Sequence, residues 1–301
     1  MHRHIVNLVL LFLLGAGAVL VWRATQPEPT ATAPLVTDQR DRIQRAGFAT
    51  PDGGRVLLER VANGWRLREP VDAPADPTEV NSLLSVASAA VHERFGLNEV
   101  DAADLGLDRP ERRLFFDDTD IAIGAVNPVT RQRFVQVGDD TVAQIDDPAG
   151  APRNATHANF VHKRIVAADR ELTRIDLPRW IVEKRDASWS ARARGHDGTR
   201  DAARAAETAE AWRTARAMWT RPLDAVDAGS GEAVTLHFAD GGSTALVAER
   251  GQQLILARPG YRVRYHVARN LAGVLLDLAA PPAAPETDPT TGKGVMAPAG
   301  N

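Results

Sequence analysis

An internal repeat constrains the fold of this chain more than any other feature of its sequence. A strand pattern at residues 56–60, a turn at Asn63-Gly64 and a return strand that begins at Trp65 predict a hairpin. The same pattern recurs at residues 181–192, where Trp189 follows Trp65 by 124 positions. Self-similarity at such a long interval predicts two copies of one folding unit within the chain.

A helical segment follows each predicted hairpin. Residues 76–79, Asp-Pro-Thr-Glu, are typical of a helix start, because the aspartate can cap the helix and the proline suits its first turn. The apolar residues from Val80 to Val91 then recur at helical spacing. In the second copy, an alanine-rich run from Asp201 to Trp219 predicts the equivalent helix, with Trp212 and Trp219 on one face.

A strand meander is predicted to close each copy. Its strands are residues 113–116, 121–124 and 133–137 in the first copy, and residues 234–238, 244–247 and 253–256 in the second. A hairpin, one helix and a meander predict an α+β fold, in which each antiparallel sheet is packed by a helix on one face. The strand order within each copy stays open at this stage.

The N-terminal segment carries no charged residue from Ile5 to Trp22. This run is 18 positions long, about the shortest helix that can span a bilayer. Trp22 and Arg23 suit the membrane interface that would follow such a helix. A cleaved signal peptide is the alternative, because 16–18 is a small-x-small site, but the apolar run continues past it. We expect a retained transmembrane helix, and either interpretation exports the rest of the chain.

These patterns divide the chain into six expected parts. They are a transmembrane anchor at 1–23, a stalk linker at 24–37, a first α+β unit at 38–148, a connector at 149–177, a second α+β unit at 178–280 and a tail at 281–301. The prolines of the stalk block helix formation, so we expect it to be extended. The Pro-, Thr- and Gly-rich tail is expected to be disordered.

Composition excludes several classes of function. The chain has 36 basic and 39 acidic residues, a formal net charge of −3, so no excess of positive charge favours nucleic acid as a partner. It has no cysteine. Disulfides, thiolate metal sites, cysteine nucleophiles and a lipid-modified N-terminal cysteine are therefore excluded.

Motifs for nucleotide binding or catalysis are poor. Gly292-Lys293-Gly294 lacks the earlier glycine and the strand of a phosphate-binding loop, and Gly229-Ser230-Gly231 lacks the spacing of a nucleophile elbow. His92-Glu93 has no second histidine four residues on, so a zinc-protease helix is not indicated. We predict no catalytic residue and no cofactor.

Two groups of side chains could in principle hold a metal ion. His157 and His162 are five positions apart, but no nearby carboxylate completes a common ligand spacing. Asp117, Asp118 and Asp120 lack the further oxygen ligands and the late glutamate of a calcium loop. We therefore predict ordinary loop or strand histidines, a polar hairpin tip at the aspartates, and no metal.

Five tryptophans lie beyond the N-terminal segment: Trp65, Trp180, Trp189, Trp212 and Trp219. Their places on predicted strands and on one helix face favour core packing over a ligand platform. Trp212 and Trp219, two helical turns apart, are the pair that could instead form an exposed surface for a partner.

Several short patterns together resemble a known bacterial family, the domain of unknown function numbered 4340. The most specific is Gly106-Leu107-Asp108-Arg109-Pro110, which precedes Ile123-Gly124 in the first meander. The resemblance is good over residues 43–165 and looser in the second copy, where Leu223-Asp224 is not a full match. It implies an exported, membrane-anchored protein and an association with ATP-binding-cassette transporters related to gliding-motility export. It implies no catalytic residues.

Two hypotheses for function follow from the sequence and the resemblance. The first is a non-enzymatic accessory or scaffold protein, held in the bacterial inner membrane by a single span at Ile5–Trp22, with its bulk in the periplasm and an envelope or transporter protein as partner. The alternative is a periplasmic ligand-binding module with a site between the two copies. An enzyme of unrecognised type ranks third. The identity of the partner and the oligomeric state stay open.

Overall fold

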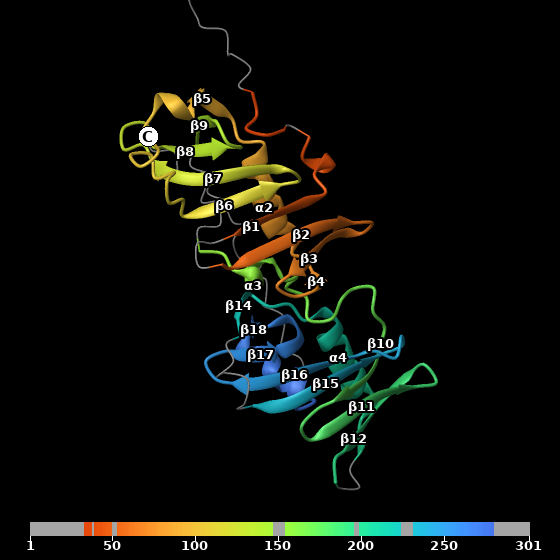
Figure 1. Cartoon of the computed structure of the whole chain (residues 1–301). Coiled ribbons are helices and arrows are strands. Elements are labelled where there is room, and N and C mark those ends of the chain that lie inside the picture. Colours follow the sequence, from red (N-terminus) through yellow and green to blue (C-terminus); the bar gives the residue numbers. More distant parts are fainter. Residues whose placement is uncertain are drawn as a thin grey trace, which may run out of the picture. The chain divides into compact units, whose positions relative to one another are not determined.

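The computed structural model describes residues 33–37, 39–49, 53–146, 154–195, 199–223 and 231–279, and Figure 1 shows their elements. These residues form two nine-stranded, mostly antiparallel sheets with few helices, which confirms the α+β class. The predicted anchor at Ile5–Trp22, the stalk up to residue 32 and the tail at 281–301 lie outside the described residues. Within the described ranges, no helix combines the length and the apolar character needed to cross a bilayer.

The first sheet has the strand order β4-β3-β2-β1-β6-β7-β8-β9-β5. Its strands are β1 (Arg45–Ala49), β2 (Arg55–Val61), β3 (Gly64–Glu69), β4 (Ala73–Pro74), β5 (Val91–Gly96), β6 (Arg112–Phe116), β7 (Thr119–Val126), β8 (Gln132–Val137) and β9 (Thr141–Asp146). The predicted hairpin corresponds to β2 and β3, and the predicted meander to β6, β7 and β8.

The second sheet has the strand order β13-β12-β11-β10-β15-β16-β17-β18-β14. Its strands are β10 (Leu172–Asp176), β11 (Trp180–Arg185), β12 (Ser188–Ala193), β13 (Thr199–Arg200), β14 (Trp219–Pro222), β15 (Glu232–Phe238), β16 (Ser243–Arg250), β17 (Leu254–Arg258) and β18 (Val263–Val267). Every strand of the first sheet thus has a counterpart nine strands later, at the same place in the order.

Both major helices begin at an aspartate cap. The main-chain N–H groups of Thr78 and Glu79 donate to Asp76 Oδ1 at 3.0 and 3.4 Å, where α2 (Pro77–Ala87) begins. Asp201 likewise accepts from the N–H of Ala203 at the start of α4 (Ala202–Thr214). The helix start predicted at residues 76–79 is confirmed, since side-chain caps satisfy N–H groups that have no partner within the helix.

Both helices end earlier than the apolar spacing predicts. The first was expected to reach Val91, but α2 ends at Ala87 and Val91 begins β5, which pairs with β9. The second was expected to reach Trp219, but α4 ends at Thr214 and Trp219 begins β14, opposite His266 of β18. No glycine or proline in the sequence forces either helix to stop there. Pairing at the edge of each sheet therefore outweighs the helical preference of these residues.

The Gly-Leu-Asp-x-Pro segment has a structural role in the first sheet. Gly106 adopts a left-handed φ of +68°, which glycine takes without the steric cost of a Cβ. Leu107 is buried against Ala122 and Val142, on a face of the sheet that this loop covers. A Cβ on Gly124 would lie 2.5 Å from the carbonyl oxygen of Leu105, so the loop packs against a strand position that only glycine fits without a shift.

The segment from residue 154 to 170 is ordered by main-chain bridges to two edge strands. After α3 (His157–Phe160), Val161 bridges Ala75, which directly follows β4. Arg164 then bridges Arg216, three residues before β14 begins. The segment therefore passes between an edge of each sheet and continues into β10, a strand within the expected connector at 149–177.

A lysine strengthens this attachment. The side chain of Lys163 is 22% exposed, and its Nζ lies 3.3 Å from Glu79 Oε1 and 3.9 Å from Asp76 Oδ2. Asp76 caps α2 and Glu79 belongs to its first turn, so one cation joins the segment to the start of that helix. The chain as a whole divides into two compact units, Met1–Ile43 with Leu83–Ala151, and Gln44–Ser82 with Pro152–Asn301. The second of these contains the β2–β3 hairpin, the segment after α3 and the entire second sheet.

Candidate functional site

A cavity of about 650 Å³ lies where the β2–β3 hairpin, residues 162–170 and the second sheet meet. All of its lining residues belong to the compact unit Gln44–Ser82 with Pro152–Asn301. Four arginines line it: Arg66, Arg164, Arg170 and Arg258. We name this cavity the arginine pocket. Its size falls within the range of small-molecule sites in proteins, about 300–1,000 Å³.

Two of the four arginines are neutralised by neighbouring aspartates. Arg66 donates from Nε to Asp72 Oδ1 at 2.9 Å. Arg170 forms a forked pair with Asp240, with nitrogen–oxygen distances of 2.8 to 3.1 Å. The hydrogen bonds from Arg170 hold the pKa of the Asp240 carboxyl below its ordinary value, so this pair is ionised at neutral pH.

The other two arginines have no carboxylate partner among the described residues. Arg258 donates to the carbonyl oxygen of Ile165 at 3.4 Å and to Thr244 Oγ1 at 3.3 Å, two neutral acceptors. The side chain of Arg164 is half-buried, and its Nε is buried without a hydrogen-bond partner in the described part of the chain. Within the described residues, neither the charge of Arg164 nor that of Arg258 is therefore balanced by a carboxylate.

Arginines are stacked on aromatic rings around this pocket. The guanidinium carbon of Arg258 lies 3.5 Å from the ring centre of Tyr261, and that of Arg170 lies 3.7 Å from the ring centre of Phe238. Stacking restricts the rotamers of an arginine while leaving its N–H groups at the edge of the plane free to donate. The pocket thus presents positive charge from partly fixed side chains.

His162 lies in the same lining and is neutral at pH 7. Its Nδ1 accepts a 3.0 Å hydrogen bond from the main-chain N–H of Arg164. Burial lowers the pKa of His162, and the charges of Arg216, Arg164 and Lys163 lower it further, while Asp76 opposes the shift. A proton on this ring would add a further charge to the pocket.

A buried tyrosine near Arg258 also lacks an acceptor. Tyr265 is fully buried on β18, and its hydroxyl makes no hydrogen bond of good geometry within the described ranges. Burial raises the pKa of Tyr265 to about 12, and the nearby Arg258 charge opposes part of that rise. Tyr265 is not among the residues that line the pocket, so its hydroxyl lies behind Arg258 rather than in the binding surface.

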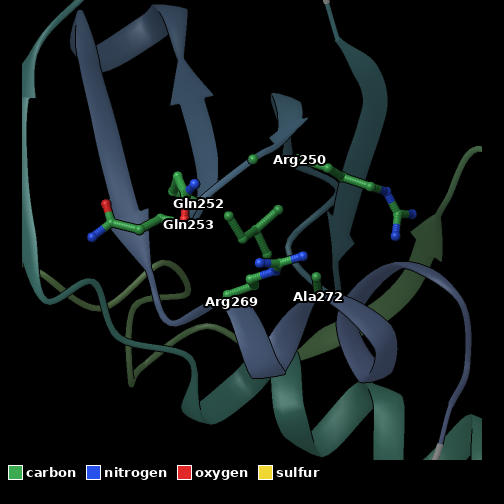
Figure 2. A pocket seen from close by; sticks show the side chains of 7 residues that line it. Arg250, Gln252, Gln253, Arg269 and Ala272 are labelled. Atoms are coloured by element: carbon green, nitrogen blue, oxygen red, sulfur yellow. The ribbon is translucent and has the colours of Figure 1, made fainter.

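A second cavity, of about 630 Å³, lies between the β16–β17 turn and the short helices η5 (Arg269–Leu271) and α5 (Ala272–Leu276). Figure 2 shows Arg269 lying across it, while the guanidinium of Arg250 points away. Arg250 is held by Glu232 and by Asp277, at 2.9 and 2.7 Å. Of the seven residues that line this cavity, none is aromatic, and few polar groups converge, so it is a weaker candidate.

The two histidines considered as metal ligands face different partners. His157 Nε2 contacts the carbonyl oxygen of Arg262 at 3.0 Å, whereas His162 lines the arginine pocket. Among the described residues, no group of three or more histidines or carboxylates is placed to hold a metal ion. His92 lies on β5 rather than on a helix, 2.8 Å from Asp146.

The acidic residues lie where hairpin tips were predicted. Asp117 and Asp118 form the turn between β6 and β7, and Asp117 has a left-handed φ of 52°. Asp120 follows on β7. The Gly229-Ser230 and Gly292–Gly294 elements lie outside the described residues.

The tryptophans are divided between core and surface. Trp212 is fully buried, so the core interpretation is confirmed for it and its use as a partner surface is wrong. Trp219 is 40% exposed and stacks on His266 at 5.4 Å, so for this residue the core interpretation is wrong. Trp65, Trp180 and Trp189 are half-buried, and Trp65 lines the arginine pocket.

The sequence interpretation missed the arginines that define the pocket. They come from β3, from residues 164–170 and from β17, segments that are far apart in the chain. The available signals were the basic run His162-Lys163-Arg164 and the arginines around Pro259-Gly260-Tyr261. Neither signal indicates a site alone, since basic residues usually lie on a solvated face.

Comparison with known proteins identifies one family. The family described as Domain of unknown function (DUF4340) matches residues 65–229, which is more than half of the chain. No curated protein matches, and no solved structure matches.

Proposed function

This chain belongs to the DUF4340 family, and we propose that it is a non-enzymatic binding module whose arginine pocket holds an anionic ligand. One observation carries the proposal: Arg164 and Arg258 line a cavity of ligand size without a carboxylate partner among the described residues. A partly buried guanidinium without a counter-ion is costly, and a bound carboxylate, sulfate or phosphate removes that cost.

The charge balance of the lining supports an anion over a cation. The lining contributes four arginines and His162, against a single carboxylate, that of Asp169. Two arginines are balanced by Asp72 and Asp240, which leaves the pocket with a net positive charge. Arginine forks match the geometry of carboxylate and phosphate oxygens better than lysine does.

Binding rather than catalysis fits the polar groups of the lining. Thr244 Oγ1 is hydrogen-bonded to Arg258, an arrangement that does not activate a hydroxyl as a nucleophile. His162 Nδ1 is occupied by a main-chain N–H and is not paired with a nucleophile. These side chains can orient and neutralise a ligand, but they do not form an acid–base pair.

The test is calorimetric titration of the purified full-length chain with sulfate, inorganic phosphate and acetate. We expect saturable binding, weakened by about tenfold or more in Arg164→Ala, because a charged hydrogen bond contributes about 1.5–3 kcal/mol. Arg258→Lys should show a smaller loss, because charge is kept while the fork is lost. Arg221→Ala, an exposed arginine on β14 of the same compact unit, removes the same charge outside the pocket. Equal losses in Arg221→Ala and Arg164→Ala would contradict the proposal.

We also propose that the two sheets derive from duplication of one hairpin–helix–meander unit. The support is the identical strand order of the two sheets and the 124-residue interval between Trp65 and Trp189. The equivalent positions of α2 and α4 between the fourth and fifth strands add to it. Sequence profiles built separately from 38–148 and 178–280 should align to each other along their length, and failure to align would count against duplication.

The place of this module in the cell is a further proposal. The apolar run Ile5–Trp22 supports a single-pass protein of the bacterial inner membrane, with the bulk of the chain in the periplasm. The resemblance supports an accessory role beside a transporter. Crosslinking in living cells with a tag at Asn301, followed by gentle solubilisation, should recover transporter subunits. Recovery of the chain alone at monomer mass would contradict the accessory role and leave the proposed binding function standing.

A further inference from the structure

The arginine pocket is larger and chemically more varied than a small inorganic anion requires. Its volume of about 650 Å³ is that of a site for an organic molecule. Besides arginines, its lining contains the aromatic rings of Trp65, Phe238 and Tyr261 and the polar side chains of Asn63 and Asp169. Each of these groups suggests a further feature of the ligand.

The aromatic lining suggests a ligand with an apolar face. Trp65 comes from the β2–β3 hairpin and is half-buried, so part of its indole surface borders the pocket. Arg60 lies over the same ring, 4.7 Å from its centre, which holds the indole in place. Aromatic rings at binding sites provide a rigid apolar surface, and the C–H face of a sugar ring packs well on such a surface.

The single carboxylate suggests a ligand that also donates hydrogen bonds. Asp169 is exposed, belongs to the pocket lining and carries the opposite charge to the arginines. It would repel a bare anion, so it adds nothing to sulfate or phosphate binding. Hydroxyl groups of a ligand could donate to Asp169 and to the amide oxygen of Asn63, since both are acceptors.

From these observations we propose that the ligand is an acidic saccharide, a sugar that carries a carboxylate or a phosphate group. The anionic group binds Arg164 and Arg258, the sugar ring packs on Trp65, and ring hydroxyls donate to Asp169 and Asn63. This inference rests on the proposed function, because it names the ligand class of the same pocket. It adds that recognition uses the apolar ring face and the hydroxyls as well as the charge.

The experiment is calorimetric titration of the full-length chain with glucuronate, glucose 6-phosphate, neutral glucose, acetate and inorganic phosphate. We expect at least one acidic sugar to bind roughly tenfold or more tightly than both its matched anion and glucose, a gain of about 1.4 kcal/mol. Glucuronate is matched by acetate and glucose 6-phosphate by phosphate, so the two arms separate the carboxylate source from the phosphate source.

The matched variants test the contact with the sugar ring. Trp65→Leu should reduce acidic-sugar affinity by roughly tenfold and leave phosphate and acetate affinity unchanged. Trp189→Leu, at the equivalent place in the β11–β12 hairpin, lies outside the pocket lining and should change neither. Circular dichroism of each variant verifies folding, and Trp65→Phe provides a more conservative ring if Trp65→Leu does not fold.

The outcomes separate the two proposals. Acidic sugars that bind no tighter than acetate or phosphate would overturn the saccharide inference and leave the anion-binding function standing. Unchanged acidic-sugar affinity in Trp65→Leu would overturn it in the same way. Absence of binding by every anion tested would overturn the proposed function and, with it, this inference.

Discussion

The indole nitrogen of Trp212 on α4 donates a 2.8 Å hydrogen bond to the carbonyl oxygen of Leu275 on α5. Both residues are fully buried, and Thr208, one turn earlier on α4, donates to the adjacent carbonyl of Val274 at 3.0 Å. Carbonyls near the end of a short helix lack partners within it, so side chains of α4 satisfy them. These two bonds fix α5 against α4.

Replacement of Trp212 should therefore destabilise the protein strongly. Trp212→Ala is expected to lower the free energy of unfolding by about 3–5 kcal/mol, because it leaves a large cavity. Trp212→Phe keeps much of the apolar volume but leaves the Leu275 carbonyl unsatisfied. This variant should lower the free energy of unfolding by about 1–3 kcal/mol. Chemical denaturation followed by circular dichroism measures both. Trp189→Phe, at a half-buried position, is the control. A loss of stability in Trp189→Phe equal to that in Trp212→Phe would show that the hydrogen bond from Trp212 to Leu275 does not stabilise the protein.

The close approach of the 102–110 loop to β7 gives a second prediction. A Cβ on Gly124 would lie 2.5 Å from Leu105 O and 2.8 Å from Leu107 Cδ2. Gly124→Ala should lower the free energy of unfolding by about 1–3 kcal/mol, because the loop or the strand must shift. At Gly251 the nearest atom to an added Cβ is 3.8 Å away, so Gly251→Ala should change stability by less than about 0.5 kcal/mol. Comparable losses in the two variants would show that Gly124 is not tightly packed.

The two helix caps should differ in their contribution to stability. Asp76 is buried, accepts from two main-chain N–H groups and lies 3.9 Å from Lys163 Nζ, whereas Asp201 is exposed and accepts from one. Loss of a cap costs about 0.5–2 kcal/mol. Asp76→Ala should fall at the upper end of this range and Asp201→Ala at the lower end, as measured by urea denaturation. The reverse order would show that burial and Lys163 add nothing to the Asp76 cap.

The elements with strong local signals were predictable, and those that depend on pairing were not. The hairpin at β2–β3 and the cap at Asp76 have turn and capping residues that act within a few positions. β1 and β10 precede each hairpin without such a signal; each pairs with the next strand along the chain, β2 or β11, and on its other side with a strand distant in sequence, β6 or β15. The ends of α2 and α4 were misplaced for the same reason, since β5 and β14 form only through pairing with β9 and β18.

The site was less predictable than the fold. Of the residues that line the arginine pocket, the sequence interpretation weighed only Trp65 and His162, one as a core residue and the other as a metal ligand. The pocket depends on the bridges that Val161 and Arg164 make to Ala75 and Arg216. Main-chain pairing of this kind does not depend on side-chain identity, so no motif marks it. The arginine cluster is therefore seen only in the structure, where Arg164 and Arg258 have no carboxylate partner among the described residues.

The neutral state of His162 gives a prediction about pH. Its folded-state pKa is lowered by burial, with the charges of Arg216, Arg164 and Lys163 adding to the effect and Asp76 opposing it. As pH falls below about 6.5, the unfolded chain takes up this proton first, so His162 lowers the stability of the ligand-free protein. Anion binding should change in the opposite direction, because the proton adds a positive charge to the pocket.

Sulfate is the suitable probe, since its own charge is constant over this range. Its affinity should rise as pH is lowered from about 8 to about 5, the interval in which histidine titrates. His162→Gln should flatten that rise and reduce the loss of stability at low pH, whereas His157→Gln, outside the pocket lining, should leave the rise in affinity intact. Titration calorimetry and urea denaturation at each pH measure the two effects. A pH profile for sulfate that is the same in His162→Gln and the unaltered chain would place the relevant proton elsewhere.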